Sequence, residues 1–520
     1  MPSIRFLMMA LAASGLPSIL AKSTSSVYPD DLTVATNTGT YTGLRNENYA
    51  GVREFRNIPF AQPPVGKLRW QPPVALPRSD AHHFSTRFPP SCPQFVSKSK
   101  SLWNQFLPSL MVNNGEGGNQ THQVAQTSSE DCLSLAVWTP YGVKQNAKLP
   151  VLFFMTGGGF QSGGIEIPSQ LPAPWVDRTQ SHIVVTINYR VNIFGFPNAA
   201  ALKHPNVGIL DQRMALEWVA ANIRRFGGDP KAITLWGQSA GAESADYLLF
   251  SHWDDPIAHA AFIQSGTALV PLKSADYKHA NFTYVAKNVG CDFPNDAAAE
   301  LSCMQQVPYP QLVNFINTHV STKRIIFGPI ADEKICFSNY TQRAAQGKMT
   351  RIPAIISNCA KETASLNGWP DDQVAGPDPA KILSGTLTTW VCTTAATCKL
   401  RDALNAPTYR YQFAGNFSNL SPLPWMGAFH ASDLFMNFGT YELPRDATEH
   451  EAAVSRAMQD HILAFARNPH HGAKSMGWAP YRYGSNVIRF GGSDGKAAQN
   501  VSGYEIDGPC YGNGTYDLSP

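Results

Sequence analysis

The sequence of 520 residues is poor in charge, because Asp, Glu, Lys and Arg make up only 15% of it, against about 25% in typical soluble domains. Its 41 Lys and Arg nearly balance its 38 Asp and Glu, for a formal net charge of +3, while apolar residues reach 43%. This composition excludes a disordered polyampholyte, which needs low hydrophobicity or a high net charge. It also leaves no basic surface for nucleic acid. We therefore expect a large folded core.

Metal-binding patterns and long apolar runs are also lacking. The nine cysteines form no C-x-x-C pair and no H-E-x-x-H occurs, so we predict neither a metal nor a cofactor. Beyond the N-terminus no run reaches about 18 uncharged apolar residues, so we predict no integral membrane segment once a leader is removed. Internal repeats and low-complexity linkers are absent too. We expect one domain over residues 22–520, and the sequence predicts no oligomeric state.

The first 21 residues have the pattern of a secretory signal peptide. Arg5 precedes an apolar stretch from Phe6 to Leu20, and Ala21 is a plausible cleavage position. A membrane anchor or a buried N-terminal helix is the alternative interpretation. Export is favoured by N-x-S/T glycosylation sequons, and we do not expect the closely spaced Asn416 and Asn419 both to carry sugar. The predicted glycosylation sites are Asn119, Asn281, Asn339, Asn416, Asn419, Asn500 and Asn513.

Along the chain, short continuous apolar runs alternate with helical patterns. Continuous apolarity is typical of parallel strands that are covered on both faces. One clear helix runs from Asp211, a plausible N-cap, to Phe226 and ends at Gly227. Residues 364–405 indicate helix and loop that cover the sheet without joining it. The expected strands are 150–155, 182–188, 233–236, 260–263, 354–357 and 409–413. The pattern predicts an α/β fold with one continuous sheet.

The pentapeptide Gly237-Gln-Ser-Ala-Gly241 points to the chemistry. By itself G-x-S-x-G is a weak signal, but here a predicted strand enters it and small residues open a helix after it. This context is typical of a nucleophile elbow, which lifts Ser239 above the sheet. Any Cβ at the flanking glycines would collide with neighbouring backbone. The alternative interpretation is a glycine-flanked surface serine.

Glycines that follow the first predicted strand of the α/β region supply the second half of an acyl-transfer site. Residues 157–160 read Gly-Gly-Gly-Phe at the place where lipases and esterases carry an oxyanion motif. We predict that the backbone N–H groups of Gly158, Gly159 and Ala240 converge on a carbonyl oxygen. A flexible glycine loop without this role is the alternative.

Four further stretches resemble the type-B carboxylesterase/lipase family, a branch of the α/β-hydrolases. They begin at Asn57, Glu130, Asn188 and Gly208, and the last one leads without a gap to Gly237. The resemblance implies the α/β-hydrolase fold, with a large mostly parallel central sheet, helices on both faces and cap or lid excursions. It also implies ester hydrolysis by a serine, an acid and a histidine, in that order along the chain.

By the same resemblance, Glu362 is the acid and His430 is the histidine of this catalytic triad. Each follows a predicted strand, although Asp332 and Glu333 are rival acids in a loop. A solvated surface role for Glu362 and a purely structural role for His430 are the alternatives. Gln238 departs from the family, many of whose members have Glu before the nucleophile. The missing negative charge makes a cationic substrate less favoured.

The function that these residues predict is secreted hydrolysis of carboxylic esters through an acyl-enzyme, with a small-molecule or lipid ester as partner. A lipase with a lid at residues 92–132 and an acyltransferase or tailoring enzyme with the same triad remain open. A non-catalytic binding protein, of the kind that the cholinesterase branch contains, is a further alternative. Residues 102–111 place apolar side chains at helical spacing, interrupted by Pro108. They suit either a mobile lid or a flap packed permanently on the body.

Disulfides are expected because an exported protein folds in an oxidising compartment. The resemblance implies that Cys92 pairs with Cys132 and that Cys291 pairs with Cys303. Of the other five cysteines, Cys359 ends an apolar strand and is our candidate for an unpaired buried thiol. Three pairings of the last four are possible, and the sequence leaves them open. These four are Cys336, Cys392, Cys398 and Cys510.

Overall fold

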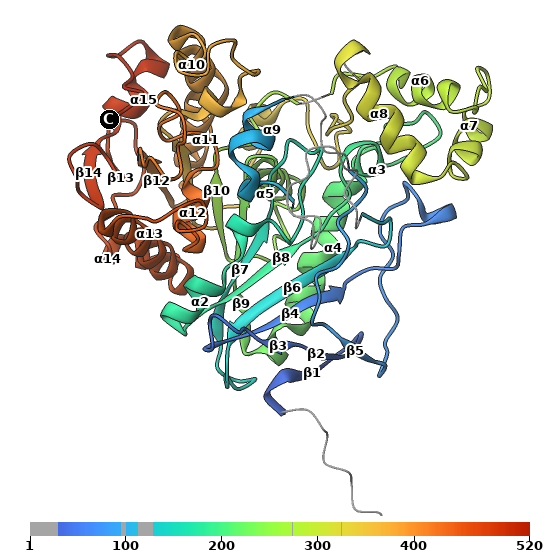
Figure 1. The fold of residues 1–520 in the computed structure, drawn as a ribbon, viewed down its shortest axis with the longest axis horizontal. Helices are drawn as coiled ribbons and strands as arrows, with labels where there is room; N and C mark the ends of the chain where they lie inside the picture. The colour runs from blue at the N-terminus through green and yellow to red at the C-terminus, as the bar shows by residue number, and fades with distance from the viewer. Residues whose placement is uncertain (1–29, 95–99, 113–127, 273, 324) are drawn as a thin grey trace, which may run out of the picture.

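The computed structural model describes residues 30–94, 100–112, 128–272, 274–323 and 325–520. The predicted signal peptide and Asn119 lie outside the described residues. An eleven-stranded sheet forms the centre of the molecule (Figure 1), in the order β14-β13-β12-β11-β10-β9-β7-β8-β6-β4-β3. A second sheet has the order β1-β2-β5. The strands are β1 Thr33–Thr36, β2 Gly39–Thr42, β3 Leu44–Arg45, β4 Val52–Pro59, β5 His82–Phe84, β6 Ser134–Pro140, β7 Leu149–Met155, β8 Ile183–Ile187, β9 Gly228–Gln238, β10 Ala260–Gln264, β11 Ala354–Cys359, β12 Thr408–Phe413, β13 Asn486–Phe490 and β14 Ala498–Ser502.

The strands of the central sheet from β8 to β13 run parallel, and antiparallel strands flank them at both edges. Every strand predicted from a continuous apolar run belongs to this parallel part, so that prediction is confirmed. The segment 364–405 contains helices and no strand, as expected. The helices are α1 Leu102–Phe106, α2 Ala173–Thr179, α3 Asn192–Gly195, α4 Val207–Asn222, α5 Ala240–Ser251, α6 Ala280–Asn288, α7 Ala297–Met304, α8 Tyr309–Lys323, α9 Tyr340–Ala345, α10 Pro379–Gly385, α11 Cys392–Ala403, α12 Asp433–Phe438, α13 Glu449–Arg467, α14 Gly472–Ser475 and α15 Gly503–Asp507. Single turns are η1 Asp30–Leu32, η2 Gly66–Leu68, η3 Pro108–Leu110, η4 Pro168–Gln170, η5 Ile223–Phe226, η6 Glu362–Leu366, η7 Thr386–Val391 and η8 Gly508–Tyr511.

The two faces of the sheet belong to two hydrophobic cores. Because side chains alternate along a strand, Val151 and Phe153 of β7 pack on one face, against α4 and α5. Leu152 and Phe154 pack on the other face, against α2, α12 and α13. Figure 1 shows these two sets of helices on opposite sides of the sheet. Burial on both faces explains why the strands are continuously apolar. The predicted α/β-hydrolase architecture is confirmed.

Helix α4 corrects one prediction. It begins at Val207 with Asn206 as N-cap, and not at Asp211. The Asp211 carboxylate is fully buried and accepts hydrogen bonds from Nε and Nη2 of Arg190 at 2.8 and 2.7 Å. A charged side chain in the second turn therefore pairs with the β8–α3 connection and does not cap the helix. The predicted end is confirmed, since η5 continues α4 to Phe226 and Gly227 follows with φ +96°.

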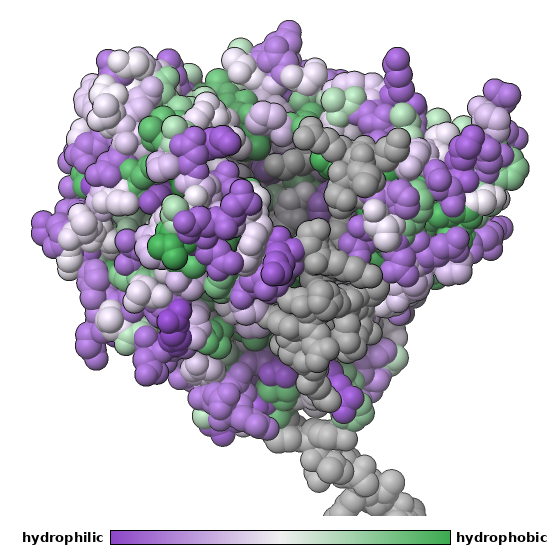
Figure 2. Space-filling model, turned by 45° about the horizontal axis from the view of Figure 1, so that its top comes forward, coloured by the Kyte–Doolittle hydropathy of each residue, from purple (hydrophilic) through white to green (hydrophobic). Residues whose placement is uncertain are grey.

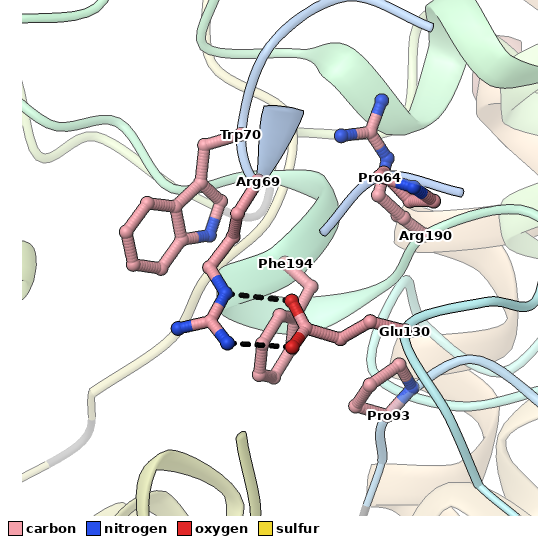
Figure 3. Close-up of a pocket in the computed structure, with 7 residues that line it drawn as sticks. All are labelled: Pro64, Arg69, Trp70, Pro93, Glu130, Arg190 and Phe194. Atoms are coloured by element: carbon pink, nitrogen blue, oxygen red, sulfur yellow. Dashed lines mark hydrogen bonds and ion pairs between the residues drawn. The ribbon is translucent and has the colours of Figure 1, made fainter. Parts of the chain in front are cut away.

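The base of the 92–132 segment is fixed by a disulfide and by a buried ion pair. Cys92 is bonded to Cys132, as predicted. Two residues before Cys132, Glu130 accepts two hydrogen bonds from Arg69, at 2.6 and 2.5 Å (Figure 3). Arg69 also donates to the carbonyl oxygens of Met304 and Val307. Removal of one partner of a buried bidentate pair leaves an uncompensated charge, which typically costs about 3–5 kcal/mol.

Residues 100–112 of this segment pack on the body of the protein. Leu102, Leu107 and Leu110 are buried in the same core as α12 and α13. Phe106 stacks on Trp369 with ring centroids 5.7 Å apart. The predicted interruption at Pro108 is present, because α1 ends at Phe106 and η3 begins at Pro108. In this conformation residues 100–112 form a packed flap.

The remaining cysteines form fewer bonds than we expected. Cys291 is bonded to Cys303, as predicted, and Cys392 is bonded to Cys510. Cys359 is free and buried, which confirms that prediction. Cys336 and Cys398 are also free and buried, so the expectation of two bonds among the last four cysteines is wrong. A count of cysteines cannot tell a disulfide from a buried thiol, and both of these side chains are packed in the hydrophobic core.

The predicted glycosylation sites differ in exposure. Asn281 is half-buried, and its Nδ2 donates to the carbonyl of Ile326. Asn419 is 7% exposed, and its Nδ2 donates to the carbonyl of Tyr441 at 3.0 Å. Of the close pair Asn416 and Asn419, the exposed Asn416 is therefore the favoured site. The other exposed sites are Asn339, Asn500 and Asn513. Among the described residues, no helix is long and apolar enough to span a bilayer.

Candidate active site

Ser239 stands in a strained turn between β9 and α5. Its φ of 55° and ψ of −124° lie in a region that costs a non-glycine residue about 1–3 kcal/mol and that persists only where the surroundings enforce it. A Cβ at Gly237 would lie 2.1 Å from the carbonyl oxygen of Gly241, and one at Gly241 would lie 2.0 Å from that of Met155. Both flanking positions therefore require glycine, as the sequence predicted.

His430 and Glu362 come together as a buried pair. Nδ1 of His430 lies 2.5 Å from Oε2 of Glu362, and the backbone N–H of His430 donates to the carbonyl of Glu362 at 3.3 Å. Glu362 is fully buried and His430 is 3% exposed. The rival acids serve their own loop, since Asp332 accepts backbone N–H groups of residues 334–336 and Glu333 accepts that of Ser338.

The second carboxylate oxygen of Glu362 is also held. Oε1 accepts the Ser265 hydroxyl at 2.6 Å and the backbone N–H of Cys359 at 2.7 Å. These two hydrogen bonds and the contact with His430 fix the carboxyl group of Glu362 in a single orientation. Sequence reasoning missed Ser265. The available signal was its position directly after the strand β10, between the strands that lead to Ser239 and Glu362.

The other ring nitrogen of His430 faces Gln238. Nε2 of His430 lies 3.2 Å from Nε2 of Gln238, so the amide N–H can donate to a neutral imidazole whose Nδ1 proton points at Glu362. Ser239 borders the same cavity as His430, and no hydrogen bond joins its hydroxyl to the imidazole among the described residues. Catalytic hydrogen bonds are often long before substrate binds. Gln238 is thus the partner of Nε2 of His430 before a substrate binds.

The predicted oxyanion glycines Gly158 and Gly159 line the same cavity as Ser239. Gly157, which is not among the predicted donors, approaches Ser239 closely, because a Cβ there would lie 2.9 Å from Cβ of Ser239. Gly158 and Gly159 have φ values of +116° and +62°, a backbone conformation that favours glycine. Ala240 is the first residue of α5, where the N–H groups are free of intrahelical partners. Thr156 anchors the strand end through its hydroxyl, which donates to Oε1 of Gln170 at 2.9 Å.

A cavity of about 410 Å³ connects these groups. The volume is within the roughly 300–1,000 Å³ range of small-molecule sites. Its apolar lining includes Trp103, Leu110, Met111 and Val112 of residues 100–112, together with Leu366 and Trp390. Figure 2, in which the top of the molecule in Figure 1 is turned forward, shows a hollow near the centre of this face, with hydrophobic residues at its border. The lining carries no Asp, Glu, Lys or Arg side chain among the described residues.

A second carboxyl group lies behind the histidine. Asp433 is fully buried, and its Oδ2 accepts hydrogen bonds from Gln264 and Tyr411 at 2.7 and 3.0 Å. Burial, with the charge of Glu362 as the next cause, raises the pKa of Asp433 to about 6. The site thus holds one carboxylate with three hydrogen bonds and a nearby carboxyl that is neutral in mild acid.

A serine raised above the carboxyl end of a central parallel strand, with a buried His–Glu pair beside it, is characteristic of the α/β-hydrolases, and the protein has that fold. The chain belongs to the carboxylesterase family, whose pattern matches residues 30–377 and 383–500. It is therefore a carboxylic ester hydrolase.

Similar proteins include fungal esterases and lipases. The chain is 40% identical over 501 residues to a chlorogenic acid esterase of Aspergillus niger, covering 92% of this chain and 94% of that one. It is 36% identical over 547 residues to secreted lipase 5 of Gibberella zeae, covering 97% and 99%. It is 27% identical over 513 residues to carboxylesterase 1F of Mus musculus, covering 88% of each chain.

Proposed function

We propose that the protein hydrolyses carboxylic esters through an acyl-enzyme on Ser239. His430, oriented by Glu362, takes the proton of the Ser239 hydroxyl while Oγ forms a bond to the carbonyl carbon. The oxyanion lies against the N–H groups of Gly158, Gly159 and Ala240. His430 then passes its proton to the leaving alkoxide as the C–O bond breaks. Water, deprotonated by the same imidazole, then attacks the acyl carbon. The bond to Oγ of Ser239 breaks, His430 returns the proton to Oγ, and the carboxylic acid leaves.

The observation that carries the proposal is the buried contact of 2.5 Å between His430 and Glu362 at the edge of the cavity that Ser239 borders. The resting contact between His430 and Gln238 must open as the serine hydroxyl takes its place. A carboxylate held by three hydrogen bonds can stabilise the imidazolium that forms next.

Replacement of Ser239 by alanine tests the proposal. In related hydrolases, loss of the nucleophile alone lowers kcat by about 10⁶, so we expect Ser239→Ala to be nearly inert toward aryl esters. The unaltered protein should gain the mass of one phosphoryl group after reaction with an organophosphate, and Ser239→Ala should not. Turnover near that of the unaltered protein in the variant would end the assignment, whereas labelling would exclude a purely binding role.

A lipase is the second candidate function. The apolar wall formed by Leu110, Met111 and Val112 suits an acyl chain, and one relative is named a secreted lipase. The packed flap supports an esterase on soluble substrates, as does the relative named a chlorogenic acid esterase. Rates with tributyrin below and above its solubility limit separate the two, because a lipase with a mobile lid gains activity when an emulsion forms.

Acyl transfer to an alcohol uses the same residues, so no contact in the site separates it from hydrolysis. Product analysis with a competing alcohol decides between them. A mainly acid product supports the hydrolase, and a mainly transesterified product supports the transferase. We also propose that the protein is exported, on the basis of the leader-like first 21 residues, the disulfides and relatives named as secreted.

A further inference from the structure

The turn η7, residues Thr386–Val391, is π-helical and lies between α10 and α11. Such turns are rare and occur frequently at functional sites. It is anchored on both sides. The Thr386 hydroxyl accepts the N–H of Thr363 at 3.2 Å, next to Glu362. Directly after the turn, Cys392 is bonded to Cys510.

This turn presents Trp390 to the site. The ring centroids of Trp390 and His430 lie 4.4 Å apart, at an interplanar angle of 41°. Trp390 is 5% exposed and borders the cavity together with Ser239 and His430. Its indole is therefore fixed against the imidazole and also forms part of the substrate wall. Among the described residues, no hydrogen bond joins Trp390 to His430 or to Glu362.

The position beside His430 identifies the part of the substrate that reaches Trp390. In ester hydrolysis the histidine gives its proton to the oxygen of the departing alcohol, so this oxygen lies next to the imidazole. The group carried by that oxygen must then extend along the surface adjacent to His430. Trp390 offers a flat apolar surface at that place, which suits offset stacking of a second ring.

We propose that Trp390 is a specificity residue that forms the alcohol side of the cavity and favours esters whose alcohol carries an aromatic or alicyclic ring. This inference rests on the proposed acyl-enzyme mechanism. Residues 100–112 border the cavity from another segment of the chain, so the alcohol preference can be altered at η7 separately from that wall.

Two ester series test the inference. The first keeps the butyryl group and varies the alcohol, from methyl to cyclohexylmethyl and benzyl, and the second keeps p-nitrophenol and varies the acyl chain from acetyl to decanoyl. For Trp390→Leu we expect kcat/KM for benzyl butyrate to fall about tenfold relative to methyl butyrate, a loss in the range of one aromatic contact with its buried area. Trp390→Phe keeps a ring and should recover part of the benzyl preference. The order of preference in the acyl series should persist in both variants.

Deacylation separates a specificity role from an effect on the histidine. It starts after the alcohol has left, so its rate constant, measured on isolated butyryl-enzyme, should fall much less in Trp390→Leu than acylation by benzyl butyrate. Equal losses for methyl and benzyl esters, or a parallel loss in deacylation, would overturn the inference. Organophosphate labelling of Ser239 is measured on the same samples. If Ser239 is labelled and the alcohol preference is unchanged, only the inference fails, whereas an active Ser239→Ala removes the mechanism itself.

Discussion

Alanine at Gly157 should lower the catalytic rate, whereas alanine at Gly159, two residues further along the same glycine loop, should lower only the folding stability. A Cβ at Gly157 would lie 2.6 Å from Oε1 of Gln238, 2.9 Å from the Gln238 carbonyl oxygen and 2.9 Å from Cβ of Ser239. Contacts this short do not persist, so the loop and the serine must separate by several tenths of an ångström. Gly159, with φ +62°, has no heavy atom within 4 Å of such a Cβ.

The magnitudes follow from these distances. Misplacement of reacting groups by about 1 Å can cost about 10² in rate, and loss of one oxyanion donor costs about 10²–10³. For Gly157→Ala we therefore expect kcat/KM to fall about 10- to 100-fold, or about 1.4–2.7 kcal/mol of transition-state stabilisation. In Gly159→Ala a non-glycine residue must adopt a left-handed backbone, which should lower the folding stability by about 1–2 kcal/mol. Because the added Cβ meets no neighbouring atom, kcat/KM should stay within about threefold of the unaltered protein, a smaller change than the tenfold step that corresponds to 1.36 kcal/mol.

Both variants are assayed with p-nitrophenyl butyrate, and their folding is checked by thermal unfolding. Full activity in folded Gly157→Ala would refute the reasoning, because it would show that the loop does not need to approach Ser239 this closely. A folded Gly159→Ala as inactive as Gly157→Ala would refute it too. Gly158 is unsuitable for this comparison, since a Cβ there would lie 2.2 Å from the Ser162 carbonyl oxygen and would disturb the fold of the loop itself.

Two further predictions concern carboxyl groups. Ser265→Ala removes a hydrogen bond of 2.6 Å to Glu362, and such a bond to a charged group is worth about 1.5–3 kcal/mol. We therefore expect kcat/KM to fall at least about tenfold, while the extent of organophosphate labelling stays the same. An unchanged kcat/KM would show that Ser265 has no role in positioning Glu362. Oε1 of Glu166 is buried and has no hydrogen-bond partner in the described part of the chain, and burial raises the pKa of Glu166 to about 7. Between pH 4.5 and 7 the unfolded state thus loses this proton first, and the free energy of unfolding falls as pH rises. In Glu166→Gln the free energy of unfolding should not fall in this way, and at pH 8 it should exceed that of the unaltered protein by about 1–2 kcal/mol, a figure reduced for partial exposure. Urea unfolding at pH 4.5 and pH 8 measures both free energies. An equal gain in stability at the two pH values would contradict the prediction.

The central strands could be predicted from the sequence because burial on both faces removes every polar residue from short runs such as 150–155. We predicted neither β4 nor β6, which pair antiparallel. Charged residues interrupt β4 and the polar Ser134 and Thr139 lie in β6, although β6 is buried along its whole length. The start of α4 was wrong because a side chain suited to capping, that of Asp211, has a stronger partner in Arg190. The capping preference of an aspartate is overridden here because Arg190, distant in sequence, pairs with the same carboxylate.

For the candidate site, the sequence contained the order of Ser239, Glu362 and His430 but not the contacts around them. Gln238 reaches His430 across 192 positions, and Trp390 reaches it from a π-helical turn that has no recognisable pattern of apolar spacing. Such contacts depend on how two covering segments meet above the sheet. They cannot be read from a local run of residues, whereas a tight turn with two obligatory glycines can.

The neighbouring strands β9, β10 and β11 also set the length of the proton path. Ser239 directly follows β9 and Glu362 follows β11, so two lateral spacings, about 9.5 Å in all, separate the strand ends that carry them. The imidazole of His430 bridges this interval, with Gln238 at the end of β9 beside one nitrogen and Glu362 beside the other. Ser265, directly after β10, holds the other carboxyl oxygen of Glu362. Because hydrogen bonds between strands hold the interval constant, segments above the sheet can diversify to accept new esters while the reach of the histidine stays the same.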